Sequence, residues 1–170
     1  MIGTTMHDGR AIANFVLDQT DAAGVAVTHL SLQKIVYFCH VWSLIELGRP
    51  LVKHSFEAWE HGPVLQYLYR EFNRFGSAPI RERAQRLNPY TGQEEVVAYA
   101  IDETALELLR RVVGFYCRLD AGTLVKLTHA PGGPWYKVWH HSGKINPGMR
   151  IDNRDIERFY ARIPRFPTLQ

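Results

Sequence analysis

Residues 28–50 read THLSLQKIVYFCHVWSLIELGRP, and this segment largely determines how the chain folds. Thr28 can cap the start of a helix, and Gly48, followed by Arg49-Pro50, can end it. Between these signals, apolar residues recur at helical spacing and also occupy the positions in between. A helix that is apolar around most of its circumference is buried on all sides. We therefore predict that this segment forms the central helix of the protein.

The flanking sequence supplies helices that can cover the central one, because apolar residues recur in it at helical spacing. We expect these helices at residues 10–19, 64–75, 102–116, 120–128 and 152–163. Pro131-Gly132-Gly133-Pro134 is expected to end the fifth of the six helices. Residues 51–63 have no sustained period and predict a structured loop. The turn residues 88–92 predict a β-hairpin with strands at 80–83 and 95–100.

These elements predict a mainly α fold, in which residues 1–170 form one domain. It is a helical bundle around the central apolar helix, with a small β-hairpin insertion. The composition agrees, since 46% of the 170 residues are hydrophobic and 22% are charged, as in an ordinary globular protein.

The sequence indicates a cytoplasmic protein. It lacks a secretory leader pattern, and no apolar run approaches the roughly 18 residues of a membrane span. Cys39 and Cys117 each lie in an apolar helical pattern, which predicts a pair of buried free thiols. Free thiols suit a reducing cytosol.

The basic residues give weak support for a nucleic-acid site. The formal net charge is only +3, from 20 Lys and Arg against 17 Asp and Glu. A phosphate-binding surface needs basic residues clustered on one face, and an ordinary solvated surface is the favoured interpretation. The alternative nucleic-acid site would use the densest basic group, which comprises Arg70, Arg74, Arg81, Arg83 and Arg86.

No complete catalytic or cofactor motif is present. The sequence lacks G-x-S-x-G, the phosphate-binding loops and H-E-x-x-H, and its two cysteines lack zinc spacing. We therefore expect no enzyme activity, no cofactor and no metal site. Glu57, Glu60 and His61 could form an acid–base pair, because a carboxylate can orient an imidazole. A loop whose side chains bond the backbone is the favoured interpretation.

Aromatic residues in two segments bounded by glycine and proline are candidates for an interface, because Trp and Tyr combine a large contact area with a polar group. These residues are Trp59 in the first segment and Trp135, Tyr136 and Trp139 in the second. For the second group, core and interface are equally compatible with the sequence. Trp42, inside the central helix, is expected in the core.

Three ordered motifs resemble the Panacea domain of SocA-like antitoxins and phage-associated GepA-like proteins. LQKIVYF at 32–38 resembles L-x-K-L-x-Y-[FL], and EAWEHGPV at 57–64 is similar to E-A-W-x-x-G-P-V. LTH at 127–129 with PW at 134–135 resembles L-[ST]-H-x-x-x-P-W. The resemblance covers roughly residues 9–160.

The resemblance implies an antitoxin of a bacterial or phage toxin–antitoxin system, which neutralises a toxin encoded nearby by direct binding. It leaves open an adaptor that delivers the toxin to a AAA+ protease. An enzyme using the loop at residues 57–61 is less favoured, and homo-oligomer formation stays open. We expect the two aromatic segments to meet in space and form the toxin-binding surface. Its residues would be Trp59, Glu60, His61, Pro63, His129, Trp135, Tyr136 and Trp139.

Overall fold

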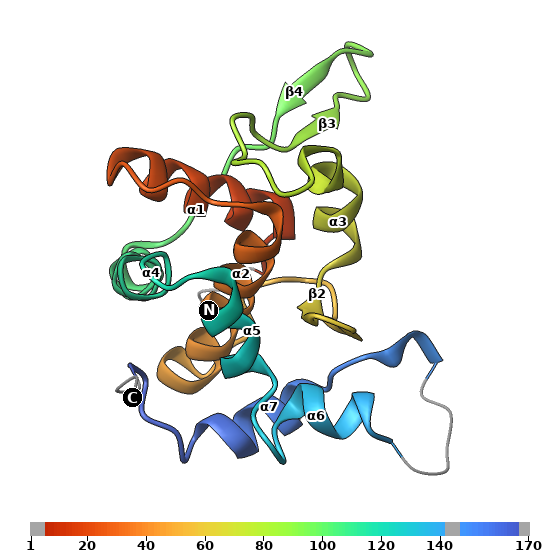
Figure 1. Ribbon diagram of the computed structural model, residues 1–170. Coiled ribbons are helices and arrows are strands. Elements are labelled where there is room, and N and C mark those ends of the chain that lie inside the picture. The colour runs from red at the N-terminus through yellow and green to blue at the C-terminus, as the bar shows by residue number, and fades with distance from the viewer. Residues whose placement is uncertain (1–5, 142–146, 167–170) are drawn as a thin grey trace.

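The computed structural model describes residues 6–141 and 147–166, and it is mainly α-helical, as predicted (Figure 1). Within these residues the α-helices are α1 (Gly9–Ala22), α2 (His29–Leu47), α3 (Gln66–Phe72), α4 (Glu103–Tyr116), α5 (Ala121–Thr128), α6 (Pro134–Trp139) and α7 (Asn153–Tyr160). The 3-10 helices are η1 (Asn73–Phe75) and η2 (Pro147–Met149). The antiparallel strand pairs are β1 (Glu57–Trp59) with β2 (Gly62–Val64), and β3 (Gln85–Leu87) with β4 (Glu94–Val96).

The central position of α2 is confirmed. This helix contacts α1, α3, α4, α5, α7 and β2, and Figure 1 shows the other helices arranged around it. The Thr28 side chain accepts a hydrogen bond from the Ser31 backbone N–H, and Gly48 ends the helix in the left-handed region at φ 64°. Both ends of the helix are therefore set by the residues that predicted them.

The main helix–helix contact of the core joins α2 to α4. Phe38 stacks on Tyr116 with ring centroids 4.2 Å apart, and Trp42 Nε1 donates to the Tyr116 hydroxyl over 3.0 Å. Leu109 and Val113 are buried on the same side of α4, whereas Leu106 is only partly buried.

Polar side chains of α2 form hydrogen bonds with the backbone of the segments that follow this helix and pack against it. The Gln33 side-chain amide donates to the Leu65 carbonyl (3.0 Å) and accepts from the Leu65 N–H (2.9 Å). The Ser43 hydroxyl donates to the Arg49 carbonyl (2.8 Å). Each of these bonds satisfies a backbone group beside the core, where an unpaired group would be costly.

His40 forms hydrogen bonds through both of its ring nitrogens. Its Nδ1 accepts from the backbone N–H groups of Leu51 and Val52, each over 3.3 Å. Its Nε2 therefore carries the proton and donates to Asn153 Oδ1 over 2.9 Å. Burial lowers the pKa of His40 to about 4. The neutral ring thus joins the segment after α2 to the start of α7.

The prediction of a loop at residues 51–63 is wrong in its second half. Residues 57–59 and 62–64 pair as a β-hairpin, in which Ala58 lies opposite Pro63. Pro63 therefore belongs to a strand and not to the first turn of a helix, and α3 begins only at Gln66. Three-residue strands are too short to show an alternating pattern, so periodicity could not reveal them.

The β3–β4 hairpin is confirmed, but its strands are displaced from the expected residues 80–83 and 95–100. The Ile80 N–H donates to the Val27 carbonyl, and the buried side chain of Asn14 in α1 bonds the backbone of Ala84 and Val97. These tertiary bonds use the backbone that a longer hairpin would need. The strands are thereby confined to the exposed tip of this segment.

Two further expectations need correction. Pro131-Gly132-Gly133-Pro134 does end α5, yet Pro134 also occupies the first turn of α6, a helix that was not predicted. Of the two free cysteines, Cys39 is buried, but Cys117 at the end of α4 is only partly buried.

None of the helices among residues 6–141 and 147–166 combines the length and apolar character that crossing a membrane requires.

We predict that Trp42→Ala lowers the free energy of unfolding by about 3–5 kcal/mol, the range for removing a large aromatic side chain from a core. Trp42 is 1% exposed and also donates to Tyr116, so the variant loses both packing and a hydrogen bond. Urea denaturation measures the change. Leu87→Ala, at a residue that is 64% exposed, should change stability by less than about 0.5 kcal/mol. Equal stability of Trp42→Ala and wild type would contradict the placement of α2.

Candidate functional site

The two aromatic segments meet in space, as predicted. Trp135 Nε1 in α6 donates to the Trp59 carbonyl at the end of β1 over 2.8 Å, and α6 contacts β1. This bond joins residues 76 positions apart in the sequence. The turn between β1 and β2 therefore lies beside α6.

Stacked aromatic rings hold Trp135 in place beside Trp59. His129, at the end of α5, stacks on Trp135 with centroids 3.5 Å apart and an interplanar angle of 1°. Trp139 lies nearly parallel to Trp135 at 5.7 Å. Burial lowers the pKa of His129, and the positive charge of Lys34 adds to this effect. His129 therefore packs as a largely neutral ring.

The eight residues expected to bind the toxin differ in exposure. Pro63 is buried and Trp135 is 4% exposed, so both belong to the support of the site. Trp59 and His129 are partly buried. The exposed members are Glu60, His61, Tyr136 (38% exposed) and Trp139 (39% exposed). We call the surface formed by these four residues the aromatic face.

Gly62 gives the turn beneath the aromatic face its shape. Its φ of +108° is a conformation that residues with a side chain rarely adopt. A Cβ atom at this position would also lie 2.7 Å from Thr128 Oγ1 and 2.8 Å from Lys34 Cε. Only glycine therefore lets the hairpin approach both α5 and α2 this closely.

Lys34 connects this hairpin to the central helix and was not singled out from the sequence. Its side chain has no exposed surface, and Nζ donates to the Pro63 carbonyl over 2.9 Å. Desolvation lowers the pKa of Lys34 to about 7. A lysine within a helix that is apolar around most of its circumference was the signal that could have identified it.

The acid–base alternative receives no geometric support from the part of the chain that the structure describes. There, neither Glu57 nor Glu60 forms a hydrogen bond with His61. Glu57 Oε2 instead accepts a hydrogen bond from Trp59 Nε1 over 2.8 Å. Likewise, no three His, Cys, Asp or Glu side chains of the described residues are grouped as metal ligands.

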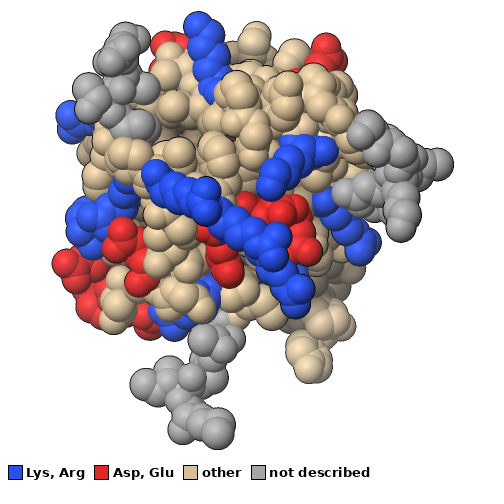
Figure 2. Space-filling view, turned by 90° about the horizontal axis from the view of Figure 1, so that it is seen from below, with Lys and Arg blue, Asp and Glu red and all other residues tan. Residues whose placement is uncertain are grey.

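Most of the arginines proposed for the nucleic-acid alternative are paired with carboxylates. Arg74 pairs with Glu82 at 2.7 Å, Arg86 pairs with Glu95 at 3.1 Å, and Arg83 pairs with both Asp18 and Asp21. Arg70 and Arg81 are exposed. On the face of α6 and α7, lysine and arginine side chains likewise lie among carboxylates (Figure 2). Such mixed charge attracts phosphate less than a uniformly basic surface does.

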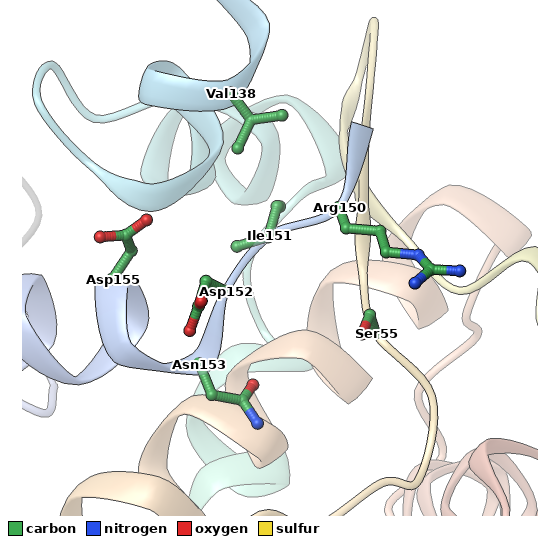
Figure 3. A pocket seen from close by; sticks show the side chains of 7 residues that line it. All are labelled: Ser55, Val138, Arg150, Ile151, Asp152, Asn153 and Asp155. Carbon is green, nitrogen blue, oxygen red and sulfur yellow. The ribbon is translucent and has the colours of Figure 1, made fainter. Parts of the chain in front are cut away.

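A hollow of about 480 Å³ lies between α6 and the start of α7 (Figure 3). Three of its polar side chains have structural roles. Asp152 caps α7 by accepting from the Arg154 N–H, Asn153 accepts from His40, and Asp155 lies 4.0 Å from Lys137 Nζ. Figure 3 shows Arg150 and Asp155 on opposite sides of this hollow. These roles make the aromatic face the stronger candidate site.

Comparison with known proteins agrees with the motifs. The family model described as "Antitoxin SocA-like, Panacea domain" matches residues 32–136, which include all three motif segments. Among curated proteins, Antitoxin SocA of Caulobacter vibrioides is 37% identical over 151 residues, which cover 88% of this chain and 80% of that protein. No solved structure matches the chain significantly.

We predict that Lys34 makes stability increase with pH above neutrality. Its pKa is about 7 in the folded protein against an ordinary value of 10.5, so the unfolded chain binds more protons between these pH values. The free energy of unfolding should rise across this window by at most about 1.4 kcal/mol per pH unit, and this contribution is lost below pH 7.

Urea denaturation at pH 7, 8 and 9 measures this contribution as a difference between variants. Lys34→Met should reduce the slope of unfolding free energy against pH, while Lys53→Met, at an exposed lysine, should keep the wild-type slope. Equal slopes for Lys34→Met and wild type would show that Lys34 does not titrate in this range.

Proposed function

Because the chain belongs to the family of SocA-like antitoxins with a Panacea domain, we propose that it neutralises a cognate toxin by binding it through the aromatic face. Family membership supports the antitoxin role and implies a toxin as the partner. We further propose that the toxin is encoded nearby, that both proteins act in the cytoplasm, and that neutralisation requires binding without catalysis.

The observation that carries this proposal is the combination of exposed rings with rigid support. Interface energy concentrates in a few aromatic or arginine anchors, and anchors that are already ordered lose less entropy on binding. Tyr136 and Trp139 are about two-fifths exposed on α6. The helix beneath them is held by the Trp135–Trp59 hydrogen bond and by the His129 stack.

The basic experiment is co-expression of this chain with the toxin encoded beside its gene. Direct neutralisation predicts that growth is rescued and that the two proteins co-purify as a complex. Growth rescue without a complex would argue against direct neutralisation.

The adaptor alternative makes a different prediction, because it requires the toxin to be degraded. The toxin should then disappear faster when this chain is present, and deletion of the AAA+ protease should restore its level. An unchanged toxin half-life, together with a stable complex, would reject the adaptor and support direct neutralisation.

The enzyme alternative is tested by His61→Ala and Glu60→Gln. If residues 57–61 catalyse a reaction, these variants should lose protection while they still bind the toxin. If protection disappears only in variants that lose binding, the chain acts by binding alone.

We predict that Tyr136→Ala and His61→Ala each weaken toxin binding by about 1–3 kcal/mol, which corresponds to roughly 5-fold to 150-fold in Kd. Both side chains are exposed, so the thermal unfolding midpoint should stay close to that of wild type. Calorimetric titration of purified toxin measures the affinity.

Tyr90→Ala is the matched control, since Tyr90 is 95% exposed on the β3–β4 hairpin, away from the aromatic face. It should bind the toxin like wild type. If Tyr136→Ala and His61→Ala keep full affinity while Tyr90→Ala loses it, the interface lies on the hairpin instead.

A further inference from the structure

A pocket of about 330 Å³ opens beside the aromatic face, between the start of α2, the β1–β2 turn and α3. Aromatic rings form much of its wall: Tyr69 lies 4.8 Å from Trp59 and 5.3 Å from His29, measured between ring centroids. Lys34 also lines it, and Glu60 lies on its wall. We call this space the Lys34 pocket.

Lys34 is a buried amine with no anion beside it among the described residues. Its Nζ has three donor hydrogens, and its hydrogen bond within the described residues goes to the Pro63 carbonyl. Desolvation accounts for the lowered pKa of Lys34, with no carboxylate acting against it. Glu60, although it lines the same pocket, forms no ion pair with Lys34 in the described structure. Buried charges in proteins are normally paired, so Lys34 lacks its usual counterpart.

His29 adds a second incompletely satisfied group to the same pocket. Its Nδ1 is buried, and among the described residues it has no hydrogen-bond partner. Burial lowers the pKa of His29, so its ring is largely neutral at neutral pH. A neutral imidazole keeps one N–H donor, and Lys34 has donors to spare. Both groups therefore suit a ligand that offers acceptor oxygens.

We propose that the Lys34 pocket receives one carboxylate-bearing side chain of the toxin, whose carboxylate pairs with Lys34 while its apolar part packs on the rings of Trp59 and Tyr69. The identity of the partner rests on the proposed function. The ligand chemistry rests on the pocket alone.

The location and size of the pocket favour a side chain of a bound protein. The pocket is lined by Glu60 and His61, which also belong to the aromatic face, so a toxin on that face would cover the pocket. Its volume of about 330 Å³ is at the lower end for small-molecule sites and suits one side chain. Lys34 lines the pocket but has no exposed surface, so a carboxylate contacts its ammonium group only when side chains of the pocket wall move aside.

The first experiment tests the pocket without the toxin, by NMR titration of the wild-type chain with two probes of the same shape. 3-Phenylpropionate carries a carboxylate, and 3-phenylpropanamide is its neutral counterpart. We expect the carboxylate to bind at least about tenfold more tightly, because a charge-assisted bond to Lys34 is stronger than a neutral one. The signals of the His29 ring and the Trp59 indole N–H should shift. Equal affinity for the two probes would overturn the proposal.

Variants then assign the preference to Lys34. Lys34→Met keeps much of the side-chain volume and removes the charge, so it should bind both probes equally weakly. Lys53→Met should keep the wild-type preference, since Lys53 is exposed and does not line the pocket. A retained preference in folded Lys34→Met would overturn the role of Lys34. If Lys34→Met does not fold, the probe pair on the wild-type chain still decides whether the pocket prefers a carboxylate.

The toxin itself provides the last test. Lys34→Met should weaken toxin binding at least about tenfold, and Lys53→Met should leave it unchanged. Toxin binding that is insensitive to Lys34→Met would overturn the proposal even if the probes discriminate. Failure of the wild-type chain to bind the toxin would instead overturn the proposed function, and the probe comparison separates that result from failure of the pocket.

Discussion

Polar side chains buried on α2 hold the backbone of the segments that surround it. Gln33, Lys34, His40 and Ser43 are all fully buried, and each bonds a backbone group of a connecting segment. A purely apolar central helix would leave these backbone groups unpaired beside the core, at a cost of about 1–3 kcal/mol each. The bonds of these four side chains allow irregular segments of the chain to pack directly against a continuous apolar core.

The candidate site depends on the same arrangement. The hydrogen bond from Lys34 to Pro63 fixes the β1–β2 hairpin on α2, and Gly62 makes the close approach sterically acceptable. The hairpin then presents the Trp59 carbonyl to Trp135, which orients α6. The exposed rings of the aromatic face are therefore positioned by successive contacts, from α2 to the β1–β2 hairpin and from the hairpin to α6. Changes at Lys34 are expected to affect both stability and the shape of this surface.

A binding role fits this construction better than a catalytic one. Within the described residues, His61 has no carboxylate partner, and His129 is stacked on Trp135 with its pKa lowered by burial. The aromatic face instead provides exposed rings on a rigid support, which is the usual form of an interface anchor. Membership of the SocA-like Panacea family points to the same class of function. The Lys34 pocket would add charge selectivity to an otherwise apolar contact.

Local signals in the sequence were sufficient for four of the seven α-helices of the described residues. Thr28, Gly48 and Asp102 act within one turn of their own positions, and helical spacing shows which faces are apolar, so α1, α2, α4 and α5 were predicted closely. The motifs were sufficient for the family, which the comparisons confirmed. The β1–β2 hairpin, the start of α6, the Trp135–Trp59 bond and the burial of Lys34 required the folded structure. The Trp135–Trp59 and Lys34–Pro63 bonds join residues 76 and 29 positions apart, so these contacts depend on how the chain packs around α2.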